Sequence, residues 1–167
     1  MRFGSPKAYA RYGGETLAER AWRVIGDACD ERLAVGKRGE LALPFELVDD
    51  DTSIRAPLAG VVAGLRAATH EIAVFLPVDT PRVTPDVLRA LGDACRDAAR
   101  PLAVPAPCAF ARDALPALEA RLLGDDLSLA GALAAVDTAT VEVDEELLED
   151  ADDPATLARL QATLVRS

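Results

Sequence analysis

The chain has 167 residues, half of them hydrophobic, with a formal net charge of −10 at pH 7 and a pI of about 4.6. This length predicts a single domain, residues 1–167, with one hydrophobic core. The negative charge argues against binding to nucleic acids or to an anionic membrane surface. The sequence shows neither the apolar core of a signal peptide nor a membrane-length apolar run, so we expect a cytoplasmic protein.

Helices and strands alternate along the chain. A capping box of Thr16 and Glu19 opens a first helix that extends to Ala28. Short apolar runs predict strands at 33–35 and 45–48, and a helix with Pro57 at its first position follows over 57–68. Residues 72–76, IAVFL, predict a fully buried strand. The remaining elements are a helix capped by Thr84 and extending to Ala98, a strand at 102–104, helices at 114–123 and 128–136, a strand at 138–143 and a helix from Asp153 to Leu164.

This alternation implies parallel β-α-β units with helices on both faces of one sheet. The predicted fold class is therefore α/β, in a three-layer α/β/α arrangement around a doubly wound, mostly parallel sheet of the Rossmann type.

Acidic residues follow several of the predicted strands, where ligands bind in an open doubly wound sheet. Asp49 and Asp50 follow one strand, Asp79 follows IAVFL, and Asp152 follows the last strand. Asp79 together with Asp152 could hold Mg²⁺, which prefers one or two carboxylates plus substrate phosphates. The alternative is that Asp79 only begins an Asp-Thr-Pro turn, and for Asp153 the role of a helix cap is favoured.

The N-terminal segment RFGSPK carries Arg2, Gly4 and Lys7, which could surround phosphate groups with backbone amides and two cations. Taken by itself, the segment is more typical of a frayed basic terminus.

The cysteines and the histidine are expected to have structural roles. Cys29, Cys95 and Cys108 fit neither a disulfide framework nor paired zinc ligands, which predicts reduced core thiols. His70, the only histidine, is expected to lie at the surface.

The ordered set RFGSPKA, APLAGVVAGL, LPVDTP and DADDPATLARL resembles the signature series of the molybdenum cofactor guanylyltransferase family over nearly the whole chain. The family pattern is an N-terminal loop LAGG-x-S-x-R-M-G-x-D-K-A, then GPLAG, a CDTP-like turn and N-x-N-T-P-E-D-L. The resemblance implies a nucleotide-diphospho-sugar-transferase-like fold, and transfer of GMP from GTP to the phosphate of molybdopterin with release of pyrophosphate.

The resemblance also implies roles for individual residues. Arg2, Gly4 and Lys7 match the phosphate-binding loop, with Lys7 as the lysine that binds phosphate. Asp79 matches the magnesium-binding aspartate, and Asp152 matches the second asparagine of the C-terminal motif. A nucleotide-contacting aspartate upstream of PLAG corresponds to Asp50, or to Asp49 if the loop is one residue longer.

The chain departs from the family pattern in three places. It begins inside the signature, so the family's first strand and LAGG turn are not in this sequence. This implies either an upstream start codon or a degenerate protein. Dimerisation through the exposed sheet edge could compensate for the missing strand.

The 104–110 stretch is short, and Gly36 or Lys37 stands where the family has asparagine, which weakens the expected pterin and base contacts. Asp150, Asp152 and Asp153 replace Asn, Asn and Thr, as in related nucleotidyltransferases. Open alternatives are therefore a transferase that uses CTP or another nucleotide, and a non-catalytic or truncated paralogue.

Overall fold

The computed structural model describes residues 6–37, 39, 41–50 and 52–164. Its main sheet has the strand order β5-β7-β6-β8, formed by β5 (Ile72–Phe75), β7 (Cys108–Ala111), β6 (Ala98–Pro101) and β8 (Thr138–Val141). β7 is antiparallel to both of its neighbours and β6 is parallel to β8, so β5, β6 and β8 run in one direction and β7 in the other. Three of the four strands therefore run in one direction, as expected of a mostly parallel sheet, and the reversed strand, β7, was not predicted.

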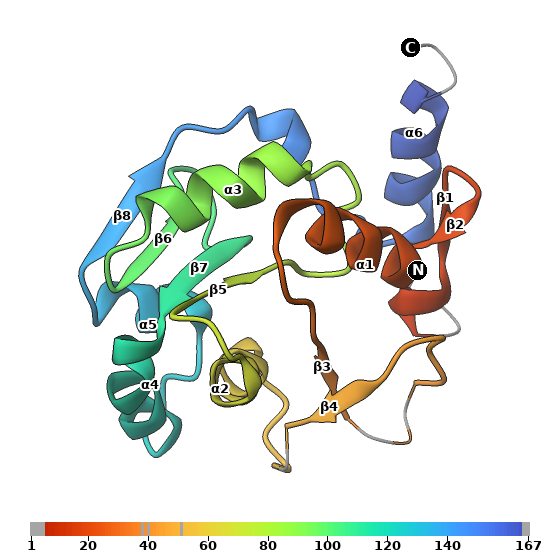
Figure 1. Ribbon diagram of the computed structural model, residues 1–167. Coiled ribbons are helices and arrows are strands. Elements are labelled where there is room, and N and C mark those ends of the chain that lie inside the picture. Colours follow the sequence, from red (N-terminus) through yellow and green to blue (C-terminus); the bar gives the residue numbers. More distant parts are fainter. Residues whose placement is uncertain (1–5, 38, 40, 51, 165–167) are drawn as a thin grey trace.

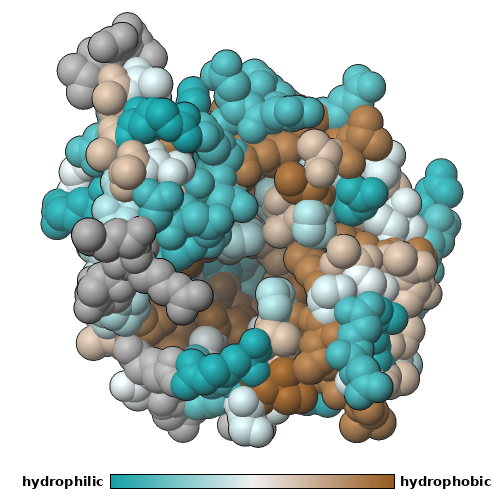
Figure 2. Space-filling model, turned by 180° about the vertical axis from the view of Figure 1, so that it is seen from behind, coloured by the Kyte–Doolittle hydropathy of each residue, from teal (hydrophilic) through white to brown (hydrophobic). Residues whose placement is uncertain are grey.

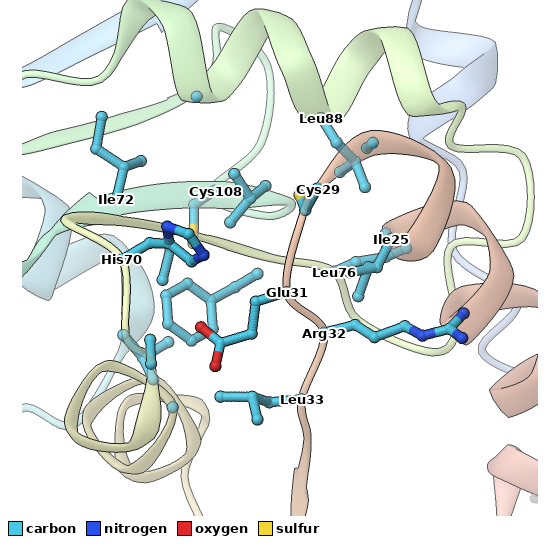
Figure 3. Close-up of a pocket in the computed structure, with 18 of the residues that line it drawn as sticks. Ile25, Cys29, Glu31, Arg32, Leu33, His70, Ile72, Leu76, Leu88 and Cys108 are labelled. Atoms are coloured by element: carbon cyan, nitrogen blue, oxygen red, sulfur yellow. The ribbon is translucent and has the colours of Figure 1, made fainter. Parts of the chain in front are cut away.

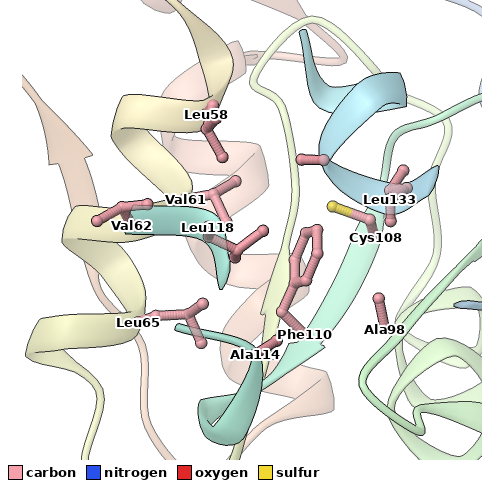
Figure 4. Packing of buried hydrophobic residues seen from close by; sticks show 11 residues of the cluster. Leu58, Val61, Val62, Leu65, Ala98, Cys108, Phe110, Ala114, Leu118 and Leu133 are labelled. Atoms are coloured by element: carbon pink, nitrogen blue, oxygen red, sulfur yellow. The ribbon is translucent and has the colours of Figure 1, made fainter. Parts of the chain in front are cut away.

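Helices cover both faces of this sheet (Figure 1). On one face lie α1 (Leu17–Ala28) and α3 (Pro85–Ala94), whose Val24, Leu88 and Leu91 join one apolar cluster. On the other face lie α2 (Pro57–Ala67), α4 (Leu115–Leu122) and α5 (Leu129–Ala134), which close around the buried ring of Phe110 (Figure 4). These two clusters are the interfaces between the sheet and the helical layers on its two faces, which gives a three-layer α/β/α arrangement.

Two further strands, β3 (Ala34–Gly36) and β4 (Leu47–Asp49), pair in parallel as a separate sheet. α2 contacts both strands. A stack of the Trp22 ring on the Phe45 ring, with centroids 4.2 Å apart and planes 3° from parallel, ties this unit to α1. In the described part of the chain, β3 and β4 make no strand pair with β5.

The N-terminal and C-terminal segments meet at one end of the molecule (Figure 1). A short hairpin of β1 (Arg11–Tyr12) and β2 (Glu15–Thr16) leads into α1 and lies beside α6 (Pro154–Leu164). Tyr12, Leu17 and Leu160 form a third apolar cluster there. The hairpin was not predicted, although a Gly-Gly pair between two short runs is a hairpin signal, and both glycines have positive φ, 60° and 91°.

The predicted helices match closely, but the strand at 102–104 is wrong. The strand is Ala98–Pro101, α3 ends at Ala94 rather than at Ala98, and β7 was not predicted. Alanine has low β-propensity, so AARP gives no strand pattern; Ala98 and Ala99 become a strand because β7 and β8 pair with them and exclude water from both residues.

Helix capping is confirmed at three of its predicted positions. Thr16 and Glu19 form the capping box, the Ser128 hydroxyl accepts from the Gly131 amide, and Asp153 accepts from the amides of Ala155 and Thr156. Thr84 precedes α3, but its side chain makes no capping hydrogen bond. No helix in the described ranges is both long and apolar enough to cross a membrane.

Candidate active site

Lys7 links two carboxylates that are distant in the sequence. Its Nζ donates to Asp152 Oδ1 at 2.7 Å and to Asp79 Oδ2 at 3.1 Å. The side chains of Lys7 and Asp79 are 32% and 27% exposed, and that of Asp152 is 73% exposed. The cluster is therefore open to a ligand from solvent on the Asp152 side.

Each of the three residues is held by local structure. Asp79 lies in a turn over residues 77–80 that follows β5, and the buried Thr80 closes that turn by donating from its hydroxyl to the Pro77 carbonyl at 2.9 Å. The Ala151 amide donates to the Asp79 carbonyl at 2.7 Å, which joins the C-terminal segment to the turn. Lys7 lies in a 3-10 turn over Lys7–Tyr9 that contacts α1. The cluster is thus assembled from three separate parts of the chain.

The electrostatics of the cluster are dominated by excess negative charge. Burial acts to lower the pKa of Lys7, but hydrogen bonds to Asp152 and Asp79 outweigh it and raise that pKa. Asp150 adds a third carboxyl nearby; burial of the group, followed by repulsion from Asp79 and Asp152, raises its pKa. One ammonium faces three carboxyl groups, so the site attracts cations and repels free phosphates.

The donor set suits a hard divalent cation. Asp79 and Asp152 each already place one oxygen against the same cationic group, and Mg²⁺ needs only one or two carboxylates when substrate phosphates and water complete its shell. Within the residues that the structure describes, no group of three or more His, Cys, Asp or Glu side chains is arranged to hold a metal without such added ligands.

The other predicted site residues lie apart from this cluster or outside the described ranges. Arg2 and Gly4 belong to the residues that the structure does not describe. Asp49 ends β4, and Asp50 follows it with its side chain only 8% exposed. Lys37 Nζ donates to Asp50 Oδ1 at 2.6 Å and to the carbonyls of Thr52 and Ile54. As the structure stands, Asp50 holds the loop after β4 through Lys37.

Two features of the site were missed by sequence reasoning. Asp150 was noted as one of the carboxylates that replace the motif's Asn, Asn and Thr and favour metal binding, but it was not predicted as a site residue, although its closeness to Asp152 was visible in the sequence. The Lys37–Asp50 pair was not foreseen, and the only signal was that both residues follow adjacent predicted strands, where parallel strands end at the same edge.

A family model matches most of the sequence. Residues 1–140 match the model described as MobA-like NTP transferase domain. The chain belongs to this family. The match covers Lys7, Asp50 and Asp79, while Asp152 lies beyond it.

Curated relatives of this MobA-like chain include molybdenum cofactor guanylyltransferases. One from Burkholderia ambifaria is 34% identical over 139 residues, which are 76% of this chain and 68% of that protein. A probable molybdenum cofactor guanylyltransferase from Deinococcus radiodurans is 36% identical over 96 residues, which are 57% of this chain and 49% of that protein. The chain therefore spans between about half and two thirds of the length of these relatives.

Solved structures share the MobA-like fold. Molybdopterin-guanine dinucleotide biosynthesis protein A from Archaeoglobus fulgidus superposes with a TM-score of 0.82 at 22% identity, over 99% of this chain and 94% of that one. A 2-C-methyl-D-erythritol 4-phosphate cytidylyltransferase from Thermus thermophilus superposes with a TM-score of 0.75 at 22% identity, over the whole of both chains. A Mycobacterium tuberculosis protein solved as a complex with manganese has a TM-score of 0.67 at 23% identity, over 95% of this chain and 93% of that one. These likenesses confirm the predicted fold class.

Proposed function

We propose that this chain carries the nucleotidyl-transfer site of a molybdenum cofactor guanylyltransferase, which transfers GMP from GTP to the phosphate of molybdopterin and releases pyrophosphate. The observation that carries the proposal is the meeting of Lys7, Asp79 and Asp152 at the end of β5. This is the edge at which doubly wound sheets bind nucleotides. The guanylyltransferase names of the Burkholderia and Deinococcus relatives support GTP and a molybdopterin-type acceptor as substrates.

The proposed cofactor is Mg²⁺, held by Asp79 and Asp152. When bound, the ion supplies positive charge to the phosphates and fixes their orientation. The solved manganese complex of the Mycobacterium tuberculosis protein supports a divalent cation in this fold.

Lys7 has two roles in this proposal. It neutralises part of the charge of Asp79 and Asp152. Because these carboxylates outnumber it, Lys7 by itself gives the site no net attraction for a triphosphate. With the carboxylates held by a divalent cation, the Lys7 ammonium would donate to phosphate oxygens, and Arg2 and the Gly4 backbone amide are proposed to do the same.

The reaction is an in-line displacement at the α-phosphorus. An oxygen of the acceptor phosphate forms a new bond to that phosphorus, and the bond from phosphorus to the bridging oxygen of the β-phosphate breaks. The electron pair leaves with pyrophosphate. The chain contributes position and electrostatic stabilisation, and the step requires no protein nucleophile.

Asp49 and Asp50 are proposed to contact the nucleotide. The Asp50 carboxylate is already paired with the Lys37 ammonium. A contact with the nucleotide therefore requires that one of these two groups binds the ligand and its partner at the same time. The contact of Asp50 with Lys37 also offers a way in which the loop over residues 52–54 could respond to nucleotide.

The second candidate is transfer of CMP from CTP to another phosphorylated acceptor. It is favoured by the complete overlap with the Thermus cytidylyltransferase fold and by the run of carboxylates at 150, 152 and 153. A non-catalytic paralogue is the third reading, and it predicts no nucleotide binding.

Isothermal titration of GTP, CTP and ATP with and without Mg²⁺ distinguishes these functions. We expect GTP binding that needs Mg²⁺ and is lost in Asp79→Asn. The matched control is Asp86→Asn, which makes the same change at a 91% exposed side chain on α3. Preference for CTP would favour the second candidate. A folded chain that binds no nucleotide, or an Asp79→Asn variant that binds GTP normally, would contradict the proposal.

A further inference from the structure

The Lys37 ammonium is enclosed by oxygen atoms of the chain. It has three N–H donors, and each has an acceptor: Asp50 Oδ1 at 2.6 Å, the Ile54 carbonyl at 2.9 Å and the Thr52 carbonyl. The side chain of Lys37 is 20% exposed and that of Asp50 is 8% exposed. Carboxylate and carbonyl oxygens are also the ligands of hard metal cations. Lys37 therefore fills a small oxygen cage, formed by these three acceptors, with its own positive charge.

The parallel pairing of β3 and β4 brings the members of the cage together. Gly36 and Asp49 are the last pair in the register of the two strands. Lys37 and Asp50 are the next residues, so they follow side by side at the carboxyl ends of β3 and β4. The Lys37 side chain consequently joins the end of β3 to the segment that leads from β4 to the start of α2 at Pro57.

Apolar packing does little to hold this segment. Every residue over 52–57 is at least partly exposed. The Thr52 amide donates to Asp50 Oδ1 at 3.4 Å, and the Ile54 amide donates to Thr52 Oγ1 at 3.1 Å, so both of these bonds act within the segment itself. The bonds from Lys37 are those that connect the segment to β3.

The strands on which the cage is built are themselves incompletely packed. Every residue of β3 and β4 is partly exposed. A cavity of about 990 Å³ lies between β5 and β3, with Val74 and Leu76 on one side and Leu33 and Val35 on the other. Leu33 points into this cavity in Figure 3, and Figure 2 shows apolar residues gathered around a hollow on the face opposite to that of Figure 1. Polar contacts therefore carry much of the order at the ends of these strands.

We propose that Lys37 is a positioning residue, whose ammonium acts as a built-in monovalent cation that fixes residues 52–54 and the Asp50 carboxylate for nucleotide binding. This inference rests on the proposed function, in which Asp50 contacts the nucleotide. The three donors of the ammonium are all used, so none is left for a base or a phosphate. The Asp50 carboxylate has a second oxygen, with which it can contact the nucleotide while Oδ1 stays with Lys37.

The test uses two substitutions at Lys37 and one control. Lys37→Ala removes the ammonium and leaves space for propylammonium, which has the length of the removed part of the side chain. Lys37→Arg keeps the positive charge, but a planar guanidinium cannot direct three donors from a single nitrogen into the cage. The control, Arg66→Met, removes a positive charge from a 57% exposed side chain on α2.

Backbone ¹⁵N relaxation without nucleotide is the first measurement. Order parameters of about 0.85 are typical of a rigid backbone, and values below about 0.6 are typical of a flexible one. The amides of Thr52 and Ile54 should be rigid in the unaltered chain and in the control, and flexible in both Lys37 variants. The amides of Val35 and Val48, within the β3–β4 pair, should stay rigid in every form.

Chemical rescue separates an ammonium in the cage from other effects of the substitution. Propylammonium should restore the order of Thr52 and Ile54 in Lys37→Ala. Two additives serve as controls: 1-propanol fills the same space without a charge, and tetramethylammonium supplies a charge without N–H donors. Neither should restore the order.

Isothermal titration of GTP in the presence of Mg²⁺ is the second measurement. The affinity should fall at least ~10-fold in Lys37→Ala and in Lys37→Arg, which is the effect of losing one hydrogen bond to a charged group. Propylammonium should restore the affinity of Lys37→Ala. If the unaltered chain binds no nucleotide, the proposed function fails, and the order parameters still decide whether Lys37 fixes the segment.

Four results would overturn the proposal. The first is an unchanged order of Thr52 and Ile54 in Lys37→Ala. The second is normal GTP affinity in Lys37→Arg, which would leave Lys37 the role of a charge only. The third is equal rescue by 1-propanol or tetramethylammonium. The fourth is loss of order at Val35 and Val48 as well, which would make Lys37 a residue that only stabilises the strand pair.

Discussion

Replacement of Lys7 by methionine should strengthen binding of a divalent cation in the absence of nucleotide. The Lys7 ammonium makes two ion pairs, at 2.7 and 3.1 Å, with the carboxylates proposed to hold the cation. A cation must break these pairs or share them. Because the side chains are partly exposed, each pair stabilises this arrangement by only about 0.2–1 kcal/mol.

Two such pairs correspond to a gain of about 2- to 30-fold in affinity when the ammonium is removed. Mn²⁺ is a suitable probe, because the electron paramagnetic resonance signal of free Mn²⁺ falls as the ion binds. The control is Arg66→Met, which removes one positive charge from a 57% exposed side chain that pairs with Glu119. Methionine keeps most of the apolar length in both variants.

The reasoning would be refuted if Lys7→Met bound Mn²⁺ no more tightly than Arg66→Met. Weaker binding would show that Lys7 supports the site by holding Asp79 and Asp152 together rather than by occupying it. Thermal unfolding of both variants checks that each remains folded.

Three further perturbations test other parts of the structure. Gly64→Ala places a Cβ 2.6 Å from a ring carbon of Phe75 on β5 and should lower the free energy of unfolding in urea titrations by about 1–3 kcal/mol. Gly60→Ala on the same helix places a Cβ that meets nothing within 4 Å and should be neutral or stabilising by up to ~1 kcal/mol. Equal effects of the two substitutions would contradict this packing. Burial raises the pKa of the Cys108 thiol to about 12. Mass spectrometry should therefore find Cys108 unmodified by iodoacetamide at pH 8 in the folded chain and modified after denaturation. Rapid labelling of the folded chain would show that this thiol is accessible to solvent. A hydrogen bond from Arg23 lowers the pKa of Glu15 despite its burial. The pair therefore stabilises the fold at pH values above the ordinary carboxyl pKa, and this stabilisation is lost as pH falls through the lowered pKa, so Glu15→Gln should reduce the melting temperature at pH 7 but not at pH 2. An equal reduction at both pH values would assign the effect to packing.

Much of the fold was predictable because its signals are local. The capping box at Thr16, the proline at the start of α2 and the apolar run of β5 each specify an element within a few residues. The alternation of these elements then predicted the three-layer architecture, which the solved relatives confirm. Because the carboxyl ends of parallel strands meet at one edge of a sheet, Asp79 and Asp152 were expected to lie near each other. Both side chains accept a hydrogen bond from Lys7.

The remaining features depend on contacts between distant segments. Ala98 and Ala99 form a strand only because β7 and β8 flank them. Lys37 meets Asp50 only because β3 and β4 pair in parallel. Neither contact can be predicted from neighbouring residues, because the two partners are far apart in the sequence and are brought together only by the fold.

The amino-acid sequence by itself determined the helices, the strands with an apolar run and the acidic residues that follow them, since hydrophobic period, caps and turns act over a few residues. Only the tertiary structure decided which of these groups meet. It set Lys7 between Asp79 and Asp152, and it placed the strand β7 between β5 and β6. The physical reason is that hydrogen bonding along a sheet and pairing of charges depend on distances between residues that are far apart in the chain.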